Sequence, residues 1–172
     1  MGDRRVPRDH RAADMRGDRD PSARIARKIV DDNLYMVIAT GDETGRPWAS
    51  PVYFANSGYA EFFWVSSPEA RHSRNIVVRP QVSIVIFDSQ SPIGTGQGLY
   101  MVAVAEEATR TELERGIDVF SRRSLAHGGP AWTPDDVSGA AEIRLYRAVS
   151  AEHSMLAKDG RPDHRIVIDV VP

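Results

Sequence analysis

The amino-acid sequence predicts a mainly β protein, a small closed or partly split barrel of six or more largely antiparallel strands with inserted helices. Three observations support this class. Short segments of strand pattern follow one another at close spacing along most of the chain. Turns rich in glycine and in small polar residues separate the first of these segments. Only a few helical patterns interrupt them, which is typical of a barrel rather than a helical bundle.

The first three strand patterns are separated by short turns. Residues 34–40 form a continuous apolar run, and residues 46–55 resume an extended pattern after a turn at 41–45. Residues 59–66 follow a second turn at 56–58. Because short turns join antiparallel strands, we expect these three strands to form an antiparallel meander. Further strand patterns lie at 81–88, 98–105, 141–149 and 166–168.

Two helices are predicted, one before the first strand pattern and one after the strand pattern at 98–105. Asp20 can cap a helix that begins at Pro21, where proline is well tolerated, and that extends through Asp32. Thr111 and Glu114, three residues apart, fit a capping box for a second helix. One apolar face of that helix is formed by Leu113, Ile117, Phe120 and Leu125.

The candidate site is the point where the third predicted strand passes into a short basic helix. We predict that Ser67 caps this helix and that Pro68 is its first residue. Backbone N–H groups at a helix start have no partner within the helix, and the helix dipole favours an anion there. Arg71, His72 and Arg74 add cationic or hydrogen-bonding groups within two turns. The pattern predicts a phosphate seat, and a solvated basic surface helix is the alternative.

Composition and charge limit the classes of function. At 172 residues the chain is expected to form one domain over residues 21–172, preceded by a mobile charged arm at 1–20. The formal net charge of -2 argues against nucleic-acid binding. No apolar run approaches the roughly 20 residues that span a membrane. Without cysteines or a signal-peptide pattern, a cytoplasmic protein is expected.

Other chemical motifs give weaker signals. The five histidines show no close ligand spacing, so no metal site is expected. No catalytic residue can be singled out, because nothing marks a nucleophile elbow. The segment 94–98 is rich in glycine but does not open a helix after a strand, so a flexible hairpin is favoured over a dinucleotide loop.

Four stretches, taken together and in order, resemble the FMN-binding split-barrel superfamily of pyridoxamine 5'-phosphate oxidase-like proteins. They are residues 34–53, the strand end at 65–67, the segment 70–76, and the strand that begins at Pro80. The resemblance covers about residues 22–170. It implies a split barrel that binds FMN at a homodimer interface and acts on a small organic substrate.

The resemblance also implies roles for particular residues. The family holds the flavin phosphate with an Arg-Lys pair, in which Arg71 matches the arginine and His72 stands at the lysine position. Residues 50–52 would lie along one edge of the flavin ring, and Gln97 would lie near the phosphate end. Apart from the resemblance, Trp132 lies on a glycine-flanked loop and is the tryptophan best placed to cover a ligand, with a core or interface position as the alternative. The expected cofactor-binding residues are Ser50, Pro51, Val52, Ser66, Ser67, Arg71, His72, Ser73, Gln97 and Trp132.

The implied function is that of an FMN-dependent oxidoreductase. Two alternatives stay open: an F420-dependent reductase of the same fold, and a binding or sensing protein that holds flavin or haem without turnover. True pyridoxamine phosphate oxidases carry an Arg-x-His-Asp-Arg type segment near the C-terminus. This chain has Arg161-Pro162-Asp163-His164-Arg165 instead. We therefore expect a related member with a different substrate.

Overall fold

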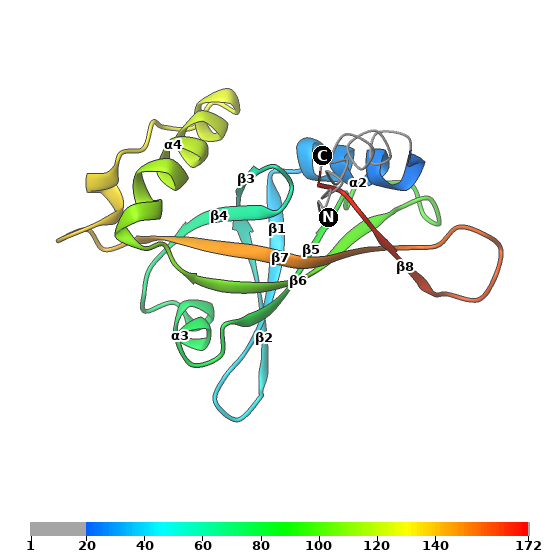
Figure 1. Ribbon diagram of the computed structural model, residues 1–172, viewed down its shortest axis with the longest axis horizontal. Coiled ribbons are helices and arrows are strands. Elements are labelled where there is room, and N and C mark those ends of the chain that lie inside the picture. Colours follow the sequence, from blue (N-terminus) through cyan, green and yellow to red (C-terminus); the bar gives the residue numbers. More distant parts are fainter. Residues whose placement is uncertain (1–19, 172) are drawn as a thin grey trace, which may run out of the picture.

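The computed structural model describes residues 20–171 and consists of one eight-stranded sheet with helices around it (Figure 1). The predicted charged arm lies outside these residues, apart from Asp20. The strands are β1 (Tyr35–Gly41), β2 (Pro47–Tyr53), β3 (Ala55–Ser57), β4 (Glu61–Ser66), β5 (Gln81–Phe87), β6 (Gly98–Glu107), β7 (Arg144–Leu156) and β8 (Arg165–Ile168). The helices are α2 (Pro21–Asp32), α3 (Arg71–Val78), α4 (Arg110–Ala126) and the short 3-10 helix η1 (Pro134–Val137).

The strands follow the order β2-β1-β5-β6-β7-β4-β3, with β8 added on β7, and neighbouring strands are antiparallel. The mainly antiparallel class is confirmed. The predicted meander is wrong beyond its first hairpin, because β2 pairs with β1 while β3 pairs with β4. β2 and β3 are the first and last strands in this order, yet only Phe54 separates them in the sequence. The sheet therefore curls, and β2 contacts β4.

The interior of the barrel is filled by alternating side chains. Along β5, Val82, Ile84 and Ile86 are buried while their neighbours are more exposed, as expected for strands with one inner face. Trp64 on β4 is fully buried and stacks on Tyr146 of β7, with ring centroids 5.6 Å apart. These side chains belong to one continuous apolar cluster.

Helix α4 packs on the outer face of β4 and β7, where Phe63 and Leu145 form a second cluster with Ile117 and Phe120. Its capping box consists of Thr109 and Glu112, two residues earlier than predicted. The buried residues of α4 are Gly116, Ile117, Phe120 and Ser124, so the predicted face is confirmed at Ile117 and Phe120. Leu125, which we expected on that face, is exposed.

Two other predictions need correction, and one is confirmed. Ser67 does not cap α3, because its hydroxyl accepts from the Glu69 N–H at 3.2 Å and its carbonyl accepts from the Ala70 N–H at 3.0 Å. These bonds close a turn, and the helix begins only at Arg71. The turn predicted at 56–58 lies slightly later, because residues 56 and 57 belong to β3 and pair with β4. Asp20 caps α2 as predicted, accepting from the Ser22 N–H at 2.8 Å.

None of the helices among the described residues is both long and apolar enough to cross a membrane.

Candidate functional site

The predicted phosphate seat is the corner where β4 ends, α3 begins and the β1–β2 hairpin folds over; we call it the Arg71 corner. The Arg71 side chain is 35% exposed, and its guanidinium carbon lies 4.4 Å from the centroid of the Trp48 ring. One guanidinium nitrogen lies 4.0 Å from an Asp42 carboxylate oxygen at the hairpin tip. The cation is thus held by a ring and a carboxylate, with part of its surface open to solvent.

The start of α3 has no side-chain cap. Ala70 is its N-cap residue and makes no side-chain capping bond, and the first turn contains no acidic residue in the described structure. The first-turn N–H groups of an eight-residue helix therefore retain their attraction for negative charge. The helix is positioned by Asn75, whose side-chain amide donates to the Thr40 hydroxyl at 3.0 Å, and by the buried Ile76.

His72 faces the barrel interior and is buried. Its Nε2 lies 2.9 Å from the Ser66 hydroxyl, and its Nδ1 lies 3.1 Å from the Ser50 hydroxyl, which also accepts from the Trp48 indole N–H at 3.0 Å. Burial lowers the pKa of His72 below its ordinary value. A neutral imidazole with both nitrogens engaged is a structural link between β2 and β4. Direct contact of His72 with a phosphate would require these bonds to break.

Replacing His72 with glutamine should make stability less dependent on pH. The folded pKa of His72 lies below 6.5, so the unfolded chain takes up the proton first as the pH falls. The stability that depends on neutral His72 is complete above 6.5 and is lost as the pH falls through the folded pKa. Urea unfolding at several pH values would give the free energy of unfolding at each. This free energy should change less steeply with pH for His72→Gln than for the natural chain.

The companion His153→Gln should act in the same direction, because burial also lowers the pKa of His153. An unchanged slope in both variants would contradict the assignment of neutral, buried imidazoles.

The other predicted cofactor residues near this corner differ in orientation. Ser50 and Val52 face inward, while Pro51 lies between them on the exposed face of β2. Ser66 is engaged by His72, and Ser67 sits in the turn before α3. Ser73 is fully buried.

Gln97 and Trp132 lie elsewhere in the chain. Gln97 directly precedes Gly98, which pairs with Phe87 at the last residue of β5. The Arg71 corner lies near the other end of β5, where this strand follows α3. Gln97 lines a cavity against α2. Trp132 packs against Phe120 over the outer face of β1 and β2. A single chain does not bring either residue to the Arg71 corner.

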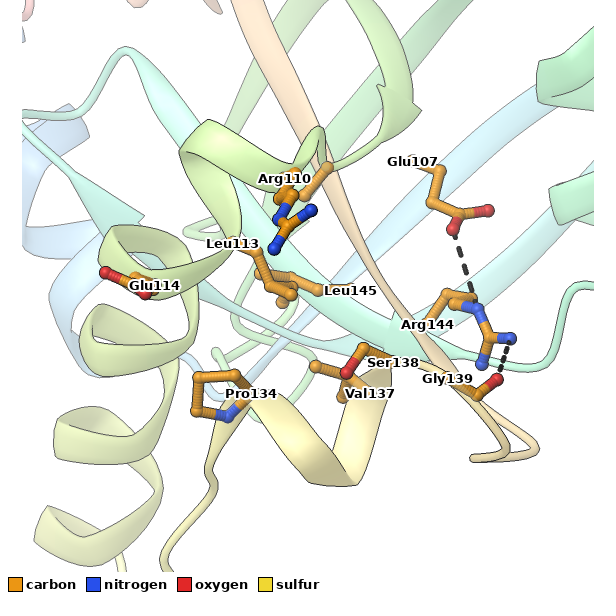
Figure 2. Close-up of a pocket in the computed structure, with 11 residues that line it drawn as sticks. Glu107, Arg110, Leu113, Glu114, Pro134, Val137, Ser138, Gly139, Arg144 and Leu145 are labelled. Carbon is orange, nitrogen blue, oxygen red and sulfur yellow. Dashed lines mark hydrogen bonds and ion pairs between the residues drawn. The ribbon is translucent and has the colours of Figure 1, made fainter.

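A second cavity, of about 450 Å³, lies between the start of α4, η1 and the start of β7 (Figure 2). Figure 2 shows Arg144 directed at Glu107, 3.6 Å away, and at the Gly139 carbonyl, 3.0 Å away. Arg110 is accompanied by Glu114 in the same lining. Arg144 also donates to the carbonyls of Ala141 and Ile143, so its hydrogen-bond donors are already engaged and the cavity is a weaker anion site than the Arg71 corner.

Sequence reasoning missed two neighbours of Arg71. Asp42 was interpreted only as a turn residue, although its carboxylate also accepts from the Thr44 hydroxyl and from the Arg46 N–H. Trp48 was not among the residues predicted for the site. Its two-residue spacing from Ser50 on one strand was a usable signal, because residues at that spacing share a face.

Comparison with known proteins identifies the family. The family model described as pyridoxamine 5'-phosphate oxidase matches residues 24–149. This range covers more than half of the chain, which therefore belongs to that family, and the sequence-based resemblance is confirmed. No curated protein matches the chain.

Solved structures show the same split-barrel fold. A haem-binding protein from Mycobacterium smegmatis is 21% identical with a TM-score of 0.67, covering 87% of this chain and 59% of its own. The haem storage protein HutZ from Vibrio cholerae is 23% identical with a TM-score of 0.59, covering 83% and 91%. A structure named F420 reductase is 20% identical with a TM-score of 0.52, covering 70% and 89%. The chain thus spans 59% of the length of the mycobacterial protein.

Proposed function

We propose that this chain binds a flat, anionic cofactor and anchors its negative group at the Arg71 corner. The observation that carries the proposal is a half-exposed guanidinium beside an uncapped helix start. An arginine can take phosphate or carboxylate oxygens in a bidentate fork, and the helix start adds backbone donors. Because His72 and Ser73 are buried, the anchor depends on Arg71, and the Ser67 hydroxyl lies in the turn just before the helix.

The first form of the proposal is a flavin-dependent oxidoreductase that acts on a small organic substrate, with FMN or F420 as the cofactor. Family membership supports it. A bound flavin supplies hydride or electron transfer, and the protein supplies binding, orientation and exclusion of water. Here Arg71 would hold the phosphate, and the exposed edge of β2 at Pro51 would lie along the ring.

The second form is a protein that holds flavin or haem without turnover. The comparisons give it more support than the first, because the structures named as haem-binding superpose with TM-scores up to 0.67, against 0.52 for the F420 reductase. A carboxylate of a haem can pair with one guanidinium, which Arg71 would supply. The missing lysine partner at His72 also fits an anchor weaker than that of an FMN enzyme.

We further propose that the cofactor is shared between two copies of the chain. Gln97 lies at the opposite end of β5 and β6 from the Arg71 corner, so it can join that corner only from a second copy. The outer face of β6 exposes Val102 and Val104, with Val149 beside them on β7. Exposed apolar side chains gathered on a sheet face are typical of protein interfaces. Analytical ultracentrifugation would show a dimer.

The anchor is tested by Arg71→Ala. Loss of a charge-assisted hydrogen bond is worth about 1.5–3 kcal/mol, so cofactor affinity should fall roughly 10- to 150-fold. Titrations of the purified protein with FMN, F420 and haemin would measure it. Arg74→Ala is the matched control, because Arg74 lies on the same helix but is exposed and pairs with Glu69 at 3.5 Å.

The control should change affinity for the bound cofactor very little. Equal affinity of Arg71→Ala and the natural protein for all three cofactors would overturn the assignment of this corner. Reduction of the bound cofactor by a nicotinamide donor would favour the oxidoreductase. Tight binding of a cofactor that no donor reduces would favour the second form.

A further inference from the structure

A pocket of about 320 Å³ lies on the outer face of β1 and β2, where α4 and the loop after it pass over these strands. Its volume falls in the range of small-molecule sites, and its lining is mainly aromatic and aliphatic. The Arg71 corner lies against Trp48 near the start of β2, while this pocket lies against Tyr53 at the end of the same strand, so the two places are separate. The lining residues are Leu34, Tyr35, Tyr53, Val65, Phe120, Ser124, His127, Gly129, Pro130 and Trp132.

Four aromatic rings form a continuous wall of this pocket. Tyr35 meets Tyr53 with ring centroids 6.1 Å apart, Tyr53 meets Phe120 at 5.5 Å, and Phe120 meets Trp132 at 5.6 Å. The interplanar angles are 78°, 82° and 78°, so each ring contacts the next edge to face. Such pairs fix ring orientation, and a further planar ring can add to the series by stacking or by edge contact.

The loop that carries Trp132 is fixed before any ligand arrives. The Trp132 N–H donates to the Ser121 hydroxyl at 2.8 Å, and the Ser124 hydroxyl donates to the Pro130 carbonyl at 2.7 Å. Gly129 passes so close to Ser124 that an added Cβ would lie 2.5 Å from its hydroxyl oxygen. A preformed pocket avoids the entropic cost of ordering a loop on binding.

His127 gives the pocket one directional polar group. Its Nδ1 lies 2.9 Å from the Arg123 carbonyl oxygen. A carbonyl oxygen only accepts, so Nδ1 carries the hydrogen. In that tautomer Nε2 is an acceptor, and it has no hydrogen-bond partner among the described residues. A ligand N–H or O–H can therefore donate to Nε2.

We infer that this pocket binds a small planar aromatic molecule that carries a hydrogen-bond donor. The aromatic wall receives the ring of the ligand, and Nε2 of His127 receives its donor. Tyr53 lies two residues from Pro51 on the same face of β2, so the pocket adjoins the strand edge assigned to the cofactor ring. If the chain binds a cofactor as proposed above, this ligand is a substrate that lies beside the cofactor; this assignment rests on the proposed function. Binding itself does not depend on the cofactor.

The test uses 1-naphthol, 1-methoxynaphthalene and cyclohexanol as probes in isothermal titration calorimetry with the purified full chain. These are a planar ring with a donor, a planar ring without one, and a donor without an aromatic ring. We expect 1-naphthol to bind best, about 3- to 10-fold more tightly than 1-methoxynaphthalene, which is the worth of one hydrogen bond. Cyclohexanol should show no measurable binding.

Variants assign the two contacts. Trp132→Ala should weaken both naphthalene probes about 10-fold. His127→Ala, at an exposed position, should remove the advantage of 1-naphthol and leave 1-methoxynaphthalene unchanged. Arg71→Ala should bind both probes like the natural protein, so this test and that of the cofactor anchor can fail separately.

The inference is overturned if cyclohexanol binds as well as 1-naphthol, or if neither Trp132→Ala nor His127→Ala alters naphthol affinity. Loss of naphthol binding in Arg71→Ala would also overturn it, since that result would move the ligand to the Arg71 corner.

Discussion

Replacing Trp64 with alanine should lower the free energy of unfolding by about 3–5 kcal/mol, the usual cost of removing a large aromatic side chain from a core. Trp64 is fully buried on the inner face of β4 and stacks on Tyr146 of β7. The truncation would leave a cavity in the barrel interior, which neighbouring strands cannot close without changing their pairing. Urea unfolding followed by circular dichroism would measure the loss.

Two further variants sharpen the Trp64 prediction. The indole N–H of Trp64 is buried without a hydrogen-bond partner in the described structure. Trp64→Phe removes this unsatisfied donor along with some volume, so it should cost only about 1 kcal/mol. Trp48→Ala is the matched control at a half-exposed tryptophan, and it should also cost about 1 kcal/mol. Similar losses for Trp64→Ala and Trp48→Ala would contradict the core assignment.

Glu61→Gln should destabilise the protein by about 3 kcal/mol, because it removes one member of a shielded ion-pair group. The Glu61 side chain is 19% exposed, and its carboxylate accepts from Arg115 at 2.7 and 2.9 Å and from Arg147 at 2.8 and 2.6 Å. Arg115 belongs to α4 and Arg147 to β7, so Glu61 ties the helix to the barrel. The variant would leave two guanidinium groups with fewer partners.

The effect of Glu61→Gln should depend on pH. Hydrogen bonds from Arg115 and then Arg147 hold the pKa of Glu61 below 4.5. The stabilisation is therefore complete above 4.5 and is lost as the pH falls through the folded pKa. The difference between the two proteins should be large at neutral pH and should shrink in acid.

Glu69→Gln provides the control for an exposed ion pair. Glu69 is 85% exposed and lies 3.5 Å from Arg74, so its removal should cost less than about 0.5 kcal/mol. A difference between Glu61→Gln and the natural protein that persists unchanged in acid would show that the loss comes from packing rather than from charge.

The sequence predicted most of the strands because their inner and outer residues alternate. Val82, Ile84 and Ile86 are an example, and the Asp20–Pro21 helix start was equally clear. The pairing of β2 and β3 was not predictable, because the change of partner at Phe54 depends on the curvature of the whole sheet. Short-range turn signals carry no such information.

The sequence predicted that the strand at 61–66 leads into a short helix with Arg71 and His72, but not how these side chains are oriented. Arg71 and His72 are adjacent in the sequence, and matching both to a phosphate-binding pair assumes that both side chains face the same ligand. Successive residues on an α-helix point about 100° apart, so Arg71 turns to solvent while His72 turns into the barrel. The start of α3 was misplaced for a different reason. Ser67 can cap a helix or close a turn with similar bonds, and the structure uses the turn.

Asp42 gives the Arg71 corner a resident counter-ion. On the proposed function, an arriving ligand would exchange with a charge that is already in place, because this carboxylate stands 4.0 Å from the guanidinium. Small monovalent ions such as chloride gain little from that exchange and should be poor competitors. Groups with two negative charges or with paired oxygens gain more, so a modest cation of this kind can discriminate among anions.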